Sequence, residues 1–370
     1  MLKKLLSATL IALAILFCFA SCDDSSSSKK PSFDAKSTPL TLENYDNQEI
    51  EGQITIIRYQ NDEINLYYSI DGGEKIEVTR GNPIKLGVGQ KVSLYGDRKE
   101  NTGSQNKYII LDSTGDCYVY GNVMSLITPT GFETNTSLKN HDYAFYSLFR
   151  ECRRIKPHEE KDLVLPATTL SSHCYEEMFY DWQHISKAPE LPALELAEAC
   201  YARMFFTCTN LTEAPTLPAM KLAELCYFYM FNGCIGLTDA PKLPATELAN
   251  NCYISMFANC YGLTESPELP ATQLTNRCYE GMFQNCKNLT TSPTLPAPTL
   301  VDSCYRSMFK GCSKLSSVTC LATTDETTDA ANGWMNGVAT DGKFIKAALA
   351  TFWKTGINGI PSGWERIDAE

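Results

Sequence analysis

The most regular feature of the sequence is a pattern of apolar positions that repeats every 26 residues. Leu-Pro-Ala and Cys-Tyr-x-x-Met-Phe recur together, each in six near-identical copies. The cysteines that open the second motif are Cys174, Cys200, Cys226, Cys252, Cys278 and Cys304. A fixed period in this range is typical of a solenoid, in which each unit buries its apolar side against its neighbours. The pattern predicts about seven stacked units over residues 143–322, the first of them degenerate.

Each unit divides into two halves. Residues 196–211 carry apolar positions three or four residues apart, which favours one face of a helix. Those positions are Leu196, Cys200, Met204, Cys208 and Leu211. Residues 211–217 (Leu-Thr-Glu-Ala-Pro-Thr-Leu) are typical of an extended segment, and its recurring proline cannot donate to a β-ladder, so we expect strands of three or four residues. The predicted fold is therefore an α/β solenoid with short parallel strands on the concave side and helices on the convex side.

Residues 39–127 alternate apolar and polar positions instead. The turn Asp71-Gly72-Gly73 separates two alternating runs at 64–70 and 75–78, which indicates a hairpin. We expect a small antiparallel β-sandwich here. Its tyrosines could line a sugar site, although cross-strand packing is the simpler interpretation. They are Tyr67, Tyr68, Tyr118 and Tyr120.

The C-terminal residues 323–370 contain three of the four tryptophans. An uncovered last unit would expose its apolar side, so solenoids need a capping segment. We interpret 323–370 as that cap, with a ligand-binding patch as the alternative.

The repeat resembles the BspA-like leucine-rich repeat family. The matching features are the Phe-x-x-Cys-x-x-Leu run at 231–237 and the Leu-Thr-x-x-Pro-x-Leu-Pro segment that follows. The unit departs from the family in its length and in its Cys-Tyr-x-x-Met-Phe form. Residues 120–127 and 359–364 resemble recurrent companions of such repeats. The resemblance implies a curved leucine-rich-repeat solenoid and cell-surface adhesion or host-protein binding by a surface lipoprotein of anaerobic Gram-negative bacteria.

The first 21 residues have the features of a secretory signal: two lysines, an apolar run at 5–17, and small residues before Cys22. This arrangement resembles the lipobox of bacterial lipoproteins, which implies lipidation at Cys22; ordinary secretion with a free thiol is the alternative. Residues 22–38 are polar and predict a flexible tether. We therefore expect a lipid-anchored protein of the outer membrane that faces the cell exterior.

The net charge and the cysteine spacing exclude several classes of ligand and partner. The chain has 370 residues and a formal net charge of −11, which argues against nucleic acid and against an anionic membrane surface. We expect contact with the membrane through the lipid anchor only. The 16 cysteines include no Cys-x-x-Cys pair, so no metal site is predicted. On a helix, Cys200 and Cys208 would lie too far apart for a disulfide, so we expect buried free thiols in two ladders and leave Cys117 and Cys320 unassigned.

Two rows of non-core positions in the extended half are the candidate binding residues. The first row is Lys187, Glu213, Asp239, Glu265 and Thr291, and the second is Glu190, Thr216, Lys242, Glu268 and Thr294. Stacked parallel strands would place successive members about 4.8 Å apart. The acidic members could bind calcium or a basic ligand, although a solvated face is the simpler interpretation.

No catalytic motif is present: the sequence lacks Gly-x-Ser-x-Gly, His-Glu-x-x-His and a phosphate-binding glycine loop. We therefore expect no catalytic residues and no cofactor. The predicted function is non-enzymatic binding of a host or bacterial surface protein or glycan through the concave rows. The alternatives are a structural or self-associating envelope component, or an auxiliary in glycan capture that uses the β-sandwich.

Overall fold

A computed structural model describes residues 33–45, 52–58, 64–79, 82–327 and 329–370. Asp34–Glu370 form one compact unit. The predicted signal segment, Cys22 and most of the predicted tether lie outside the described residues. Within the described ranges, we find no helix with the length and apolar character needed to span a membrane.

Two sheets form the N-terminal region. The strands of the larger one are β1 (Thr41–Asn44), β3 (Ile64–Ile70), β4 (Ile76–Glu77), β6 (Lys91–Arg98) and β8 (Cys117–Asn122). They run in the order β8-β1-β6-β3-β4, each antiparallel to the next. The smaller sheet is antiparallel β5-β2-β7 (Ile84–Leu86, Gly52–Arg58 and Ile109–Ser113). The predicted β3–β4 hairpin is confirmed, and its turn places Asp71 and Gly72 at φ 49° and 75°.

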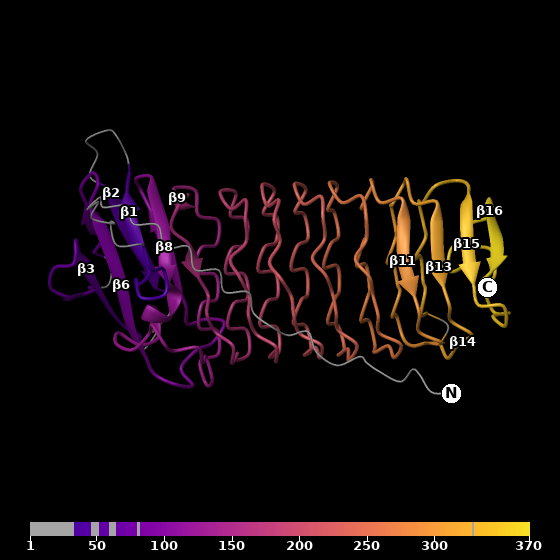
Figure 1. Ribbon diagram of the computed structural model, residues 1–370, viewed down its shortest axis with the longest axis horizontal. Coiled ribbons are helices and arrows are strands. Elements are labelled where there is room, and N and C mark those ends of the chain that lie inside the picture. The colour runs from indigo at the N-terminus through magenta and orange to yellow at the C-terminus, as the bar shows by residue number, and fades with distance from the viewer. Residues whose placement is uncertain (1–32, 46–51, 59–63, 80–81, 328) are drawn as a thin grey trace, which may run out of the picture. The chain divides into compact units, whose positions relative to one another are not determined.

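Strand β8 joins this region to the repeats. It pairs in parallel with β9 (Ile155–Pro157) and β10 (Leu163–Val164), both of which belong to the degenerate first unit. The sheet of the N-terminal region therefore continues directly into the first coil (Figure 1).

The prediction of an α/β leucine-rich-repeat solenoid is wrong. The only helical element in the described ranges is a short 3-10 turn, η1 (Val123–Leu126), which precedes the repeats. The segment expected to be helical is a series of overlapping turns. Its backbone N–H groups alternate: Cys200 N donates to Ala197 O within the coil, whereas Tyr201 N donates to Cys226 O of the next coil. Five such bonds link residues 199–207 to the next coil.

The segment is not helical because its turn conformation repeats every four residues, with two side chains directed into the core and two directed outward. An α-helix has 3.6 residues per turn, so a four-residue spacing drifts around its axis, whereas this chain keeps Tyr201 and Phe205 on one inner side. The regular turns need a left-handed residue at every fourth position, as at Ala199, Arg203 and Thr207, where φ is 48–55°. Bonds to the neighbouring coils stabilise this conformation, which an isolated helix would not need.

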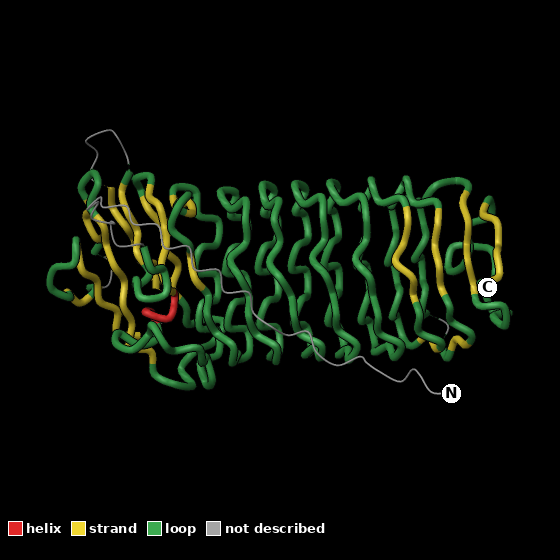
Figure 2. Tube along the Cα trace, in the orientation of Figure 1, coloured by secondary structure: helices red, strands yellow, loops and turns green. Residues whose placement is uncertain are grey.

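After the degenerate first unit with its β9 and β10, the extended half forms strands only towards the C-terminus (Figure 2). There, β11 (Thr291–Leu295), β13 (Ser317–Cys320), β15 (Gly342–Lys346) and β16 (Trp364–Asp368) make one parallel sheet. Strands β12 (Thr299–Leu300) and β14 (Thr324–Asp325) pair separately. Strands of three or four residues were expected in every unit. The middle coils have none, and no backbone hydrogen bond joins 212–217 to 238–243, two segments described in full.

Columns of identical side chains fill the core. Phe205 and Phe231 stack with ring centroids 5.5 Å apart, and Tyr201 and Tyr227 stack at 6.1 Å. The segment expected to be a cap continues this column, because Trp334 stacks on Tyr305 at 6.1 Å. It also adds β15 and β16 to the sheet.

Candidate functional site

All ten row positions proposed from the sequence are exposed. They lie on the extended side of the coils, where the alternate positions Leu211 and Leu217 point into the core and are buried. The apolar positions hold nearly the same residue in every unit, whereas the row positions vary between basic, acidic and hydroxyl side chains. The buried residues of the extended side are therefore nearly constant from unit to unit, whereas its exposed side chains vary.

Neighbouring members of a row do come together where the coils pair. Lys187 and Glu213 form a parallel bridge, and their side chains make an ion pair of 3.9 Å while remaining 72% and 66% exposed. In the second row, Thr216 Oγ1 donates to Glu190 Oε2 at 3.0 Å. Such exposed contacts contribute little to stability, so these side chains are available to a ligand.

The positions of the acidic residues in the first row do not support calcium binding. The described residues contain no group of three or more histidine, cysteine, aspartate or glutamate side chains arranged to hold a metal ion. Glu213, Asp239 and Glu265 therefore present separate carboxylates.

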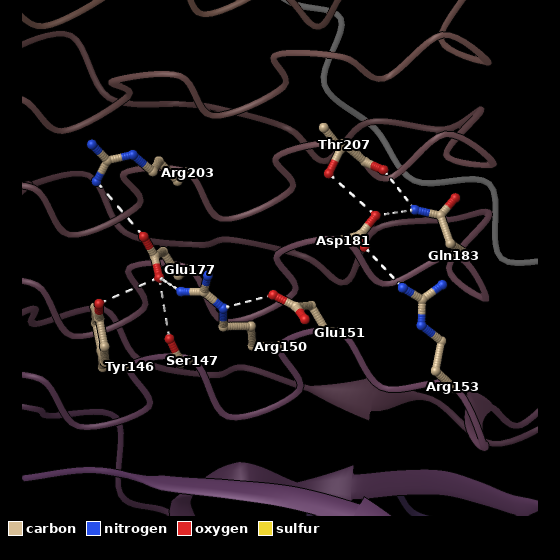
Figure 3. Close-up of polar contacts among 10 residues, drawn as sticks. All are labelled: Tyr146, Ser147, Arg150, Glu151, Arg153, Glu177, Asp181, Gln183, Arg203 and Thr207. Carbon is tan, nitrogen blue, oxygen red and sulfur yellow. Dashed lines mark hydrogen bonds and ion pairs between the residues drawn. The ribbon is translucent and has the colours of Figure 1, made fainter. Parts of the chain in front are cut away.

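A network of polar side chains lies on the turn side of the first coils, and sequence reasoning missed it (Figure 3). Glu177 is buried and accepts hydrogen bonds from Tyr146, Ser147 and Arg150, the last at 2.5 Å. Arg203 approaches the other oxygen of Glu177 at 3.7 Å. A buried carboxylate requires such partners, because desolvation destabilises its charge.

Glu176 extends this network through Arg203, and Asp181 is the centre of a second, separate group of polar contacts. Glu176 is 3.2 Å from Arg203 Nη1 and 2.6 Å from His173 Nδ1, and this contact raises the pKa of His173. Asp181 accepts hydrogen bonds from Arg153 and Gln183 (Figure 3). The partners satisfy these groups, so we interpret the network as one that holds the first coils together. The adjacent acids at 176 and 177 could have indicated this network in the sequence. They depart from the repeat, because the corresponding positions of the next two units hold Ala-Arg and Phe-Tyr.

Every cysteine in the described ranges is a buried free thiol, as predicted. The reason given from helix geometry was wrong, because no helix is present. Cys234 Sγ donates to Phe205 O of the preceding coil at 3.0 Å, and the equivalent thiols repeat this bond. Burial raises the pKa of Cys208 and Cys260 to about 12, so the thiolates needed for redox or metal chemistry are disfavoured. Cys117 and Cys320, unassigned from the sequence, lie in β8 and β13 and face the same core.

The tyrosines of the N-terminal region divide into two groups. Tyr118 and Tyr120 lie on β8, next to the first coil, whereas Tyr67 and Tyr68 lie on β3. Strands β1 and β6 separate β3 from β8, so the four tyrosines do not form one site.

Comparisons with protein-family models, with curated proteins and with solved structures find no match to this chain.

Proposed function

We propose that the protein is a non-enzymatic binding protein, lipid-anchored in the outer membrane and facing the exterior, that recognises a surface protein or glycan through the two exposed rows. The observation that carries the proposal is the contrast within each coil. The buried positions hardly change from unit to unit, whereas the ten row positions are all exposed and chemically varied. A row of exposed side chains on a repeated frame is the usual binding surface of repeat proteins.

The test is capture of the surface-displayed chain on immobilised matrix proteins and glycans. The triple variant Glu213→Gln, Asp239→Asn, Glu265→Gln removes three charges from the first row. A matched control removes three exposed charges from another side of the same coils: Glu195→Gln, Glu224→Gln, Glu247→Gln. We expect the first variant to weaken capture about tenfold and the control to preserve it. Equal capture by both would exclude the first row.

Protease treatment of intact cells tests the orientation. Loss of the protein from intact cells is expected if it faces the exterior, and protection until the outer membrane is opened would contradict this placement. Lipidation is tested separately by Cys22→Ser, which should release the protein from the membrane fraction.

One observation bears on the alternative of a self-associating envelope component. Strand β16 lies at the edge of its sheet, a position that another strand can extend. Its exposed residues Glu365, Arg366 and Asp368 are charged, which is how sheet edges avoid such pairing. We therefore expect a mass independent of concentration in light scattering, and growth with concentration would favour self-association.

A further inference from the structure

Strand β8 pairs with β1 and with β9 (Figure 1). A row of aromatic rings lies at these strands. Successive ring centroids are 4.1 Å apart between Tyr45 and Tyr118, 4.8 Å between Tyr118 and His158, and 5.5 Å between His158 and Tyr120. The residues come from three distant parts of the sequence, and all except Tyr120 are partly exposed. We call Tyr45, Tyr118, Tyr120, Lys156 and His158 the Tyr118 cluster.

Two lysines lie over these rings, and only one of them forms an ion pair with a carboxylate. Lys161 lies 4.3 Å from the Tyr120 centroid and is paired with Glu43 at 2.8 Å. Lys156 lies 4.5 Å and 4.9 Å from the centroids of Tyr45 and Tyr118. No carboxylate of the described residues forms an ion pair with Lys156. The cluster thus presents a positive charge on an aromatic surface without a paired acid.

His158 adds a directed donor. Its Nδ1 accepts the backbone N–H of Glu160 at 3.0 Å, so the neutral ring carries its proton on Nε2. Burial and the nearby charge of Lys161 lower the pKa of His158, which favours this neutral form. Within the described residues, neither His158 Nε2 nor the Tyr118 hydroxyl has a hydrogen-bond partner. These two groups are available to a ligand, beside the Lys156 ammonium group, whose side-chain partner is the Tyr45 hydroxyl.

We propose that the Tyr118 cluster binds a carboxylate-bearing glycan, with a sugar ring against the aromatic row and its carboxylate on Lys156. A pyranose has an apolar C–H face and a polar rim, which matches rings that combine an apolar body with polar tips. An ammonium group favours the charged carboxylate, and a few directed donors beside aromatic side chains are typical of ligand sites. A neutral sugar would not use the charge of Lys156, and an acidic peptide would not need the rings.

The test measures binding of the full-length chain to polygalacturonate by affinity electrophoresis and calorimetry. We expect Lys156→Met and Tyr118→Leu each to weaken binding about tenfold or more. Lys75→Met is the matched control, because Lys75, which directly precedes β4, lies 3.9 Å from the centroid of Tyr95 on β6, in the same kind of contact elsewhere in the sheet. It removes the same charge and should leave binding within about twofold. Circular dichroism and thermal unfolding verify that each variant is folded.

Two further probes separate the ligand classes. Fully methyl-esterified pectin should bind at least about tenfold more weakly, because it lacks the carboxylates. Poly-glutamate binding as tight as polygalacturonate, with the same dependence on Tyr118, would overturn the glycan assignment. Absence of polygalacturonate binding, or equal effects of Lys156→Met and Lys75→Met, would also overturn it. The Tyr118 cluster lies outside both rows, so failure here leaves the proposed function of the rows intact.

Discussion

The two sides of the central coils contact the next coil in different ways. On the turn side, five backbone hydrogen bonds connect residues 199–207 to the next coil, and the aromatic columns stack beneath them. On the extended side, the described segments 212–217 and 238–243 share no backbone hydrogen bond. Proline at 215 and 241 removes a donor from each segment, and the side chains at Leu211 and Leu217 hold the segments through burial.

This difference shows where substitutions are tolerated. A substitution on the turn side must fit a left-handed backbone or a packed column, whereas a substitution at an exposed extended-side position between 212–217 and 238–243 disturbs no β-ladder. The side with fewer constraints carries the variable rows, which is the arrangement that a binding surface needs.

The largest effect should come from breaking a column on the turn side. Phe231 is fully buried and stacks on Phe205 and Phe257, so Phe231→Ala should lower the free energy of unfolding by about 3–5 kcal/mol. Chemical denaturation measures it. Met220→Ala, at a residue that is 52% exposed, is the control and should change stability by less than about 0.5 kcal/mol. Similar losses in both variants would contradict the comparison.

Two substitutions at equivalent left-handed positions should change stability in opposite directions. Ser255 has φ 51°, and the equivalent residue of the next unit is Gly281 at φ 61°. Ser255→Gly should raise stability by about 0.5–1 kcal/mol, because glycine adopts this conformation without strain. Gly281→Ser should lower it by a similar amount, and its new Cβ would also lie 2.8 Å from Ser255 Oγ. Shifts of the same sign in thermal unfolding would show that strain is not the cause.

A smaller, pH-dependent effect is expected at His173. The hydrogen bond to Glu176 raises the pKa of His173 in the folded chain above its unfolded value. Its stabilising contribution is therefore complete below the unfolded pKa of about 6.5 and is lost as pH rises through the folded pKa. His173→Asn suits the left-handed φ of 57° and removes the titration. Thermal unfolding between about pH 5.5 and about pH 8.5 should decline more in the parent than in this variant, and parallel profiles would refute the assignment.

The smallest effect should come from the extended side. The triple variant Glu213→Gln, Asp239→Asn, Glu265→Gln should change the free energy of unfolding by less than about 0.5 kcal/mol, because the three side chains are exposed. Denaturation midpoints measure it. A loss above about 1 kcal/mol would mean that the row stabilises the coils and is not free for a ligand.

The sequence predicted the 26-residue period, the buried apolar positions and the exposure of the row positions, because burial of a repeated apolar pattern needs no knowledge of the backbone. It failed at the turn side, where apolar spacings of three and four residues fit both a helix and a four-residue turn repeat. A signal was available in the column Asp181, Thr207, Gly233, Asn259, Asn285 and Gly311. Asparagine, aspartate and glycine favour left-handed backbone and disfavour helix interiors. The sequence suggested Tyr118 and Tyr120 as possible sugar-binding residues, but the rest of the Tyr118 cluster could not be predicted, because only the strand pairing brings residues 45 and 156–158 next to them.

The identical turn-side bonding between the central coils has an evolutionary consequence. Gain or loss of one 26-residue block in the middle, by recombination between near-identical copies, would leave both ends of the stack unchanged. Each gain would lengthen the array by one coil and add one position to each row. The reach of the surface can therefore evolve in whole steps, independently of the chemistry displayed at any one of them.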